Sequence, residues 1–153
     1  MMSPDKVSKR IIADRLDWIE TMLNDISVLP MDSFEHFTHE RRTMWAAESC
    51  LRRALEAMLD LGRHVVAKGL GKGVSEYKEI PVLLSQAGIL STERARVMKQ
   101  MAGYRNRLVH FYHEVSVQEL YTICAGQLQD IRSVTQEINE WLKAHPEIMD
   151  DQL

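Results

Sequence analysis

The sequence predicts an all-α protein, an antiparallel bundle of four main helices and one short helix. Apolar residues recur every three or four positions along most of the 153-residue chain, which places them on one face of a helix. Residues that typically cap or stop helices bound these stretches. No segment shows the alternation of apolar and polar residues that a half-buried strand requires. The short loops between the helices favour antiparallel neighbours.

The first helix is expected to begin at Ser3 and Pro4, which have the pattern of an N-cap followed by proline at the first helical position. Pro30 is expected to stop it. Its apolar face consists of Ile12, Leu16, Ile19, Leu23 and Ile26.

The second helix is expected to start near Asp32 and Glu35, which have capping-box spacing, although Ser33 is an alternative cap. We expect it to run without interruption to about Lys68, before the glycine-rich loop 69–73. Its apolar stripe is Phe37, Met44, Leu51, Leu55, Met58 and Val65.

A short helix is expected over roughly residues 76–86, with Pro81 limiting where its hydrogen bonds can begin and Gly88 ending it. The fourth helix is expected to start at Ser91 or Thr92 and to continue to about residue 112.

Ser116 and Glu119 form a capping box for one long last helix, which ends before Pro146. Thr135 alone interrupts its apolar stripe. The stripe consists of Val117, Tyr121, Cys124, Leu128, Ile131, Ile138 and Leu142.

Composition indicates one ordinary globular domain over residues 1–153, with an acidic tail from about residue 146. Apolar residues make up 45% of the chain and charged residues 27%, which argues against a disordered protein. No apolar run approaches the roughly 20 residues of a membrane span, and the N-terminus lacks a signal-peptide centre. Cys50 and Cys124 lie far apart in helical patterns, so we expect no disulfide scaffold and a cytoplasmic protein.

The net charge of −3 conceals a basic segment between Arg94 and His113, which contains five cations and no acidic residue. Such a segment on an acidic protein suggests a partner that carries phosphate, although a solvated helix face is the simpler interpretation. The cations are Arg94, Arg96, Lys99, Arg105 and Arg107.

Residues 103–113 concentrate two arginines, two histidines, two tyrosines and an asparagine. Arginine holds phosphate with a planar fork of donors, and histidine exchanges protons near neutral pH. Together they supply much of what RNA cleavage by its own 2′-hydroxyl requires, without a metal. However, Arg105 and His110 lie about 140° apart around a helix, and one histidine leaves the second proton transfer without a donor. A homodimer that joins two such helix ends would meet both needs.

The spacing Arg105-x4-His110-x-Tyr112 resembles the RX4HXY motif of HepT-like toxins in the HEPN superfamily. The flanking residues resemble the family as well. The similar segments are Tyr104-Arg105-Asn106-x-Leu108-Val109-His110, Ala54-Leu55-Glu56-Ala57-x-x-Asp60 with His64, and Tyr77-Lys78-Glu79 through Leu83-Leu84 to Ala87-Gly88-Ile89. Pro81 departs from the family pattern, so the short helix is expected to start late. Arg107 and His113 offer a second register, which lacks the x-Tyr that follows His110.

The resemblance implies a HEPN bundle, a homodimer with a composite cleft, and metal-independent endoribonuclease activity with no cofactor. Arg105 and His110 carry over as the catalytic pair and Asn106 as their polar neighbour. The family partner is an MNT-type nucleotidyltransferase antitoxin, in what is termed a type VII toxin–antitoxin system. It would inactivate the toxin by transferring AMP to Tyr112, which adds bulk and negative charge beside a site for RNA phosphate. Arg107 and Lys99 join Arg105 as expected RNA-binding residues.

Several other residues carry weaker hypotheses. Glu48 lies on the apolar stripe of the second helix and is expected either to orient the catalytic pair or to be paired structurally. Asp60 is either a polar cleft residue or part of a solvated face. His36 and His39 have the spacing of metal ligands but lack further ligands.

Two alternative functions follow from these observations. The first is a non-catalytic helical module that binds a nucleotidyltransferase. The second is a metal-dependent hydrolase that uses His36 and His39, whose activity a chelator would abolish.

Overall fold

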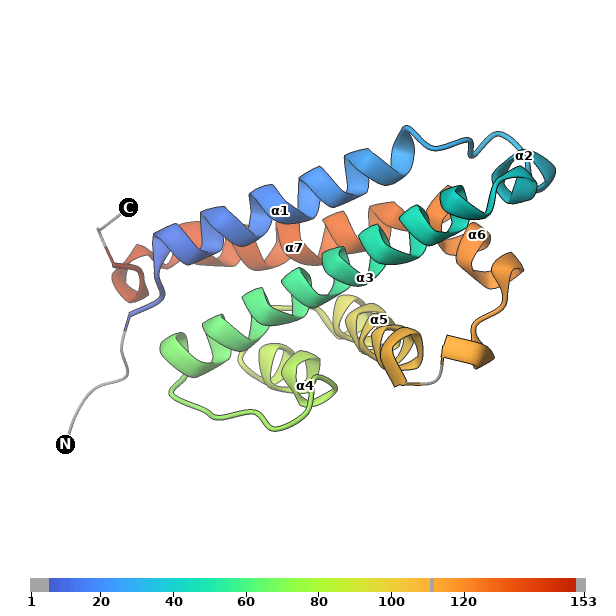
Figure 1. The fold of residues 1–153 in the computed structure, drawn as a ribbon. Coiled ribbons are helices and arrows are strands. Elements are labelled where there is room, and N and C mark those ends of the chain that lie inside the picture. Colours follow the sequence, from blue (N-terminus) through green and yellow to red (C-terminus); the bar gives the residue numbers. More distant parts are fainter. Residues whose placement is uncertain (1–5, 111, 151–153) are drawn as a thin grey trace.

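Seven α-helices make up most of the computed structural model, which describes residues 6–110 and 112–150 (Figure 1). The helices are α1 (Lys9–Ser27), α2 (Phe34–His39), α3 (Arg41–His64), α4 (Glu79–Gln86), α5 (Thr92–His110), α6 (Val117–Gly126) and α7 (Leu128–Ala144). Shorter helical turns cover Val65–Gly69, Tyr112–Glu114 and Pro146–Ile148.

The long helices α1 and α3 lie side by side and run in opposite directions, and α7 returns antiparallel to α1 (Figure 1). Helix α5 packs against α3 and α7, and α4 covers the junction of α3 and α5. Most residues of the predicted stripes lie in the core, where Leu23, Leu51 and Met58 are completely buried. Val117 is an exception, because it begins α6 and is 40% exposed. The all-α antiparallel bundle is therefore confirmed. No helix of the described residues is both long enough and apolar enough to cross a bilayer.

The start of α1 differs from the prediction. Ser3 and Pro4 lie outside the described residues, and α1 begins only at Lys9, where the Ser8 side chain accepts a hydrogen bond from the Ile11 N–H. Val7 instead forms an isolated parallel bridge with Met149. The backbone of Val7 is thereby paired with a segment that is remote in sequence, which a local capping pattern cannot reveal.

The predicted second helix is wrong in its continuity, because Glu40 is extended (φ −118°, ψ 130°) and separates α2 from α3. Ser33, rather than Asp32, caps α2 by accepting from the His36 N–H. The break allows Phe37, which is fully buried, to pack 5.2 Å from the ring of Tyr121 on α6. Burial of an aromatic ring outweighs the few helical hydrogen bonds that the break removes.

The last helix is also divided, at Gln127 (φ −123°), so the prediction of one long helix is wrong. Ser116 caps α6 as predicted, accepting from the Glu119 N–H at 3.0 Å. Helix α6 packs against α2 and α3, whereas α7 contacts α5 most extensively. Gly126, which costs about 1 kcal/mol in a helix relative to alanine, marks the point where the direction changes. The described residues therefore form seven α-helices, instead of the predicted four main helices and one short helix.

Helix α4 starts at Glu79, later than the predicted residue 76. Pro81 lies in its first turn, where a backbone N–H has no helical partner and its absence costs little. Gly88 follows the helix with a φ of +76°, the conformation expected of a glycine that ends a helix. Ser91 caps α5 by accepting from the Arg94 N–H.

His64, at the end of α3, connects the start of α1 to the bundle. Its Nε2 accepts a hydrogen bond from the Ser8 N–H at 2.9 Å. Burial lowers the pKa of this imidazole, and Lys68 and Arg15 act in the same direction. The neutral ring is therefore the form that the folded protein favours.

We expect the stability that His64 contributes to be present above about pH 6.5, its ordinary pKa. It should be lost as the pH falls through the lowered pKa of the folded state, because the unfolded chain binds the proton more readily. The loss should not exceed about 1 kcal/mol, the usual net value of one hydrogen bond. Urea unfolding between pH 7.5 and pH 5 measures it. An equal pH dependence in His64→Gln would contradict the assignment.

Candidate active site

The last two turns of α5 contribute Arg105, Asn106 and His110 to one pocket of about 530 Å³. Arg63 from α3 and residues 75–78, which precede α4, complete its wall. Arg105 and His110 thus face the same pocket despite their angular separation on the helix. The length of the arginine side chain closes the gap, as proposed from the sequence.

The Arg105 side chain is held from three directions and is only 19% exposed. Its Nε lies 3.7 Å from Glu56 Oε1 on α3, and its Nη1 donates to Asn106 Oδ1 at 3.3 Å. Its guanidinium carbon lies 4.8 Å from the centre of the Tyr77 ring, within cation–π range. These contacts orient the guanidinium before any ligand arrives.

Tyr77 is a central residue of this pocket whose role the sequence did not indicate. Its hydroxyl donates to Asp60 Oδ1 at 3.2 Å, and its ring also contacts the Arg63 guanidinium at 4.7 Å. Burial raises the pKa of the Tyr77 hydroxyl, and the Asp60 carboxylate acts in the same direction. The phenol therefore stays protonated at neutral pH and connects two arginines to a carboxylate.

Arg63 was also missed, because it lies on α3 about 40 residues before the motif and has no distinctive local pattern. It adds a second guanidinium to the pocket. Tyr77 and Lys78 were noted only as part of the similarity to the family. Both belong to the segment between α3 and α4, and the fold brings them to the pocket that Arg105 lines.

Asp60 is not among the residues that line the pocket. It lines a neighbouring hollow with Arg15, Trp18 and Glu56, and its Oδ1 accepts from the hydroxyl of Tyr77, which does line the pocket. Its place in the structure is that of a supporting carboxylate rather than a group exposed to a ligand in the pocket.

Glu48 lies in a different hollow, beside Trp45, Leu108 and Val117. Within one chain the structure does not bring its carboxylate to the pocket of Arg105 and His110.

The Arg107 side chain is bound to α6 and does not line this pocket. Its guanidinium forms a two-pronged ion pair with Glu119 on α6, with N–O distances of 2.7 and 3.1 Å. It also donates to the Glu114 carbonyl oxygen. Arg107 thereby ties the turn after α5 to α6, which favours Arg105 as the arginine of the site.

The remaining predicted residues lie around the pocket. Lys99 is exposed on α5 and lines an adjacent hollow that also contains Lys78. The backbone of Tyr112 begins the short turn Tyr112–Glu114 directly after α5, but its side chain lies outside the part of the chain that the structure describes. The site of AMP transfer that the resemblance implies therefore stays a prediction.

The metal hypothesis for α2 has little support from the geometry. His36 pairs with Asp32 at 2.7 Å on an exposed surface. No group of three or more histidine, cysteine or acidic side chains suited to a metal occurs within residues 6–110 and 112–150.

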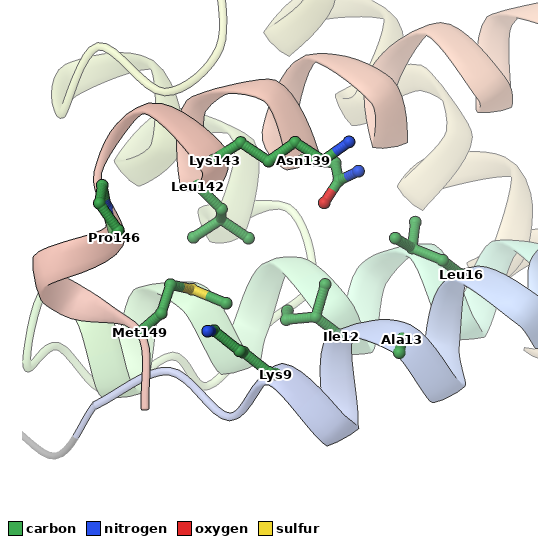
Figure 2. A pocket seen from close by; sticks show the side chains of 9 residues that line it. All are labelled: Lys9, Ile12, Ala13, Leu16, Asn139, Leu142, Lys143, Pro146 and Met149. Atoms are coloured by element: carbon green, nitrogen blue, oxygen red, sulfur yellow. The ribbon is translucent and has the colours of Figure 1, made fainter. Parts of the chain in front are cut away.

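A second cavity, of about 360 Å³, lies between the start of α1 and the end of α7 (Figure 2). Its walls are mainly apolar, with Ile12, Leu142 and Met149 facing the space and Lys9 and Lys143 beside them. No histidine or carboxylate is found among the described residues that line it. The pocket at the end of α5 instead combines two arginines with a histidine, so it is the candidate active site.

The helical arrangement is that of HEPN toxins. A tri-AMPylated HEPN toxin of Shewanella oneidensis, solved in complex with an MNT antitoxin, matches with a TM-score of 0.77 and 21% identity, covering 85% of this chain and 97% of that one. YutE of Bacillus subtilis, a cytosolic protein of unknown function, matches with a TM-score of 0.74 and 18% identity, covering 92% and 94%. Both likenesses show a shared fold.

The chain belongs to the ribonuclease HepT-like family, which matches residues 14–138. The tRNA nuclease HepT of Aphanizomenon flos-aquae (strain 2012/KM1/D3) is 25% identical over 133 residues, covering 86% of this chain and 90% of that protein. The family predicted from Arg105, His110 and Tyr112 is thereby confirmed.

Proposed function

We propose that this protein is the toxin of a HEPN/MNT toxin–antitoxin pair and acts as a metal-independent endoribonuclease. The observation that carries the proposal is the convergence of Arg105, fixed by Glu56 and Tyr77, with His110 in one pocket. Membership of the ribonuclease HepT-like family supports it. Because a relative is named a tRNA nuclease, tRNA is the first substrate to test. RNA and nucleotides are the reactants, so a cytoplasmic site of action fits the proposal.

In the proposed reaction, the 2′-oxygen attacks the neighbouring phosphorus atom and the bond to the 5′-oxygen breaks. Arg105 binds the phosphate and offsets the negative charge that develops on it. His110 removes the 2′-proton or donates a proton to the leaving oxygen. The products are a 2′,3′-cyclic phosphate and a 5′-hydroxyl.

The second proton transfer needs another group. Among the described residues that line the pocket, His110 is the one histidine, and it is exposed at the end of α5. A homodimer that brings two α5 ends together would supply a histidine for each role. AMP on Tyr112, two residues beyond His110, would add negative charge where the RNA phosphate must bind. An MNT nucleotidyltransferase that modifies this residue fits the role of antitoxin, and its complex with the toxin can be larger than a dimer.

We expect the purified protein, with intact mass confirming that Tyr112 carries no AMP, to cleave RNA in the presence of EDTA. Products should carry 2′,3′-cyclic phosphate ends, detected by mass spectrometry. An all-2′-deoxy strand of the same sequence should stay intact because it lacks the nucleophile. Cleavage that stops with EDTA would support a metal-dependent hydrolase instead. No cleavage of tRNA, ribosomal RNA or messenger RNA would favour the non-catalytic binding module.

A further inference from the structure

Another hollow, of about 520 Å³ and distinct from the groove of Figure 2, lies beside the candidate active site and shares Lys78 with it. Its walls come from α4 and α5 and include Val82, Leu83, Gln86 and Lys99. The two hollows are therefore neighbours along the exposed surface of α5. A ligand longer than one phosphate group can extend from one into the other past the Lys78 side chain.

The position of Lys78 follows from a glycine on α5. A Cβ atom added to Gly103 would lie 3.6 Å from Lys78 Cε and 3.8 Å from its Nζ. The lysine therefore lies across α5 at Gly103, one turn before Asn106. Lys99, Gly103, Asn106 and His110 follow at intervals of four, three and four residues, so they lie along one face of the helix.

This face carries two ammonium groups beside the candidate active site. Lys99 precedes Asn106 by seven residues, which is about 10 Å along a helix. Neither lysine is in an ion pair with any residue that the structure describes. Glu79 also lines this hollow, but its carboxylate is bound to the loop, where it accepts from the Ser75 N–H at 3.0 Å and from the Ser75 hydroxyl at 3.2 Å.

The hollow also offers surfaces that suit a nucleobase. Val82 is 43% exposed, and it forms an apolar wall with Leu83. The amide of Gln86 supplies a donor and an acceptor nearby. Sites for single-stranded nucleic acid combine a cationic groove with side chains that pack against the bases, most often aromatic ones. In this hollow the aliphatic side chains of Val82 and Leu83 would take that place.

We propose that this hollow binds the nucleotide that flanks the scissile phosphate, with Lys78 and Lys99 holding its phosphate and Val82 and Leu83 contacting its base. The inference rests on the proposed function and extends it. The site thereby takes a single RNA strand over more than one phosphate, and affinity depends on the length of the strand.

Binding of 2′-O-methyl RNA tests the subsite without cleavage, since this probe has no free 2′-hydroxyl. Fluorescence anisotropy is measured for a labelled dinucleotide and hexanucleotide over a range of KCl concentrations. We expect the hexanucleotide to bind at least tenfold more tightly than the dinucleotide. The Lys78→Gln, Lys99→Gln double variant should lose most of that gain. Dinucleotide binding should weaken by a smaller factor, because Lys78 also lines the active-site pocket. The salt slope of the variant should fall by about 0.7, the value for one phosphate contact on a single strand.

The controls separate this inference from the proposed function. Lys78→Arg, Lys99→Arg should retain hexanucleotide binding, and Lys143→Gln, in the groove of Figure 2, should have no effect. Wild-type protein that binds the hexanucleotide through the two lysines but cleaves no RNA would contradict the proposed function and leave the subsite intact. Equal hexanucleotide affinity in the wild type and the glutamine variant would overturn the subsite. An acidic protein surface would then be the better candidate for the partner that these lysines bind. A wild type that does not favour the hexanucleotide would overturn it too.

Discussion

Replacing His110 with alanine is expected to reduce the rate of RNA cleavage by about 10²- to 10⁴-fold, the usual contribution of a general acid or base. The imidazole is exposed at the end of α5, so the fold should not depend on it. Single-turnover cleavage in EDTA measures the loss, with circular dichroism confirming the helical content. His113→Ala is the matched control, because it removes a histidine from the next helical turn without touching the pocket.

Replacing Arg105 should reduce the rate of RNA cleavage by a similarly large factor, and the loss should depend on which side chain replaces it. Arg105→Ala removes the charge that would stabilise the transition state, a loss of about 10²- to 10³-fold by comparison with other such donors. Arg105→Lys should restore only part of the rate, because an ammonium group cannot reproduce the planar fork that lies over Tyr77 beside Glu56. Activity that survives in the His110 and Arg105 variants but fails in His113→Ala would instead assign the reaction to the Arg107 and His113 register.

Gly62 is the position where a single added side chain should destabilise the fold most directly. A Cβ atom at this buried glycine of α3 would lie 2.7 Å from Ile80 Cγ2 on α4 and 3.0 Å from Met98 Cε on α5. The methionine end can move, but the isoleucine methyl group is attached to a stiff, branched Cβ. Three helices therefore meet at a contact that has no room for a side chain.

We expect Gly62→Val to lower the free energy of unfolding by about 1–3 kcal/mol, the typical cost of overpacking. Displacement of α4 should also move Tyr77 away from Arg105, so that cleavage weakens in the fraction that remains folded. Urea unfolding measures the first effect. Gly126→Ala is the control, because its Cβ would meet no atom within 4 Å, and it should leave stability unchanged or raise it by about 0.4–1 kcal/mol. An unaltered unfolding midpoint in Gly62→Val would show that α4 can shift without cost.

The local features of the fold were predictable because they depend on residues a few positions apart. The apolar stripe of α1 is buried at Ile12, Ile19, Leu23 and Ile26, as its spacing predicts. Ser116 caps α6 at the predicted residue. The breaks at Glu40 and Gln127 were not predictable, because the helical periodicity continues through both positions and only packing against other helices decides them.

The sequence by itself determined the helical class, the family, and the arginine and histidine of the candidate site, because the motif lies within one helix. Tertiary structure decided which residues surround that pair. It placed Tyr77 against both Arg105 and Arg63, directed Arg107 to Glu119, and left Glu48 in a separate hollow. The physical reason is that a helix fixes the direction of its own side chains through local hydrogen bonds. Their partners come from elements about 10 to 50 residues away, which only the packing of the bundle brings together.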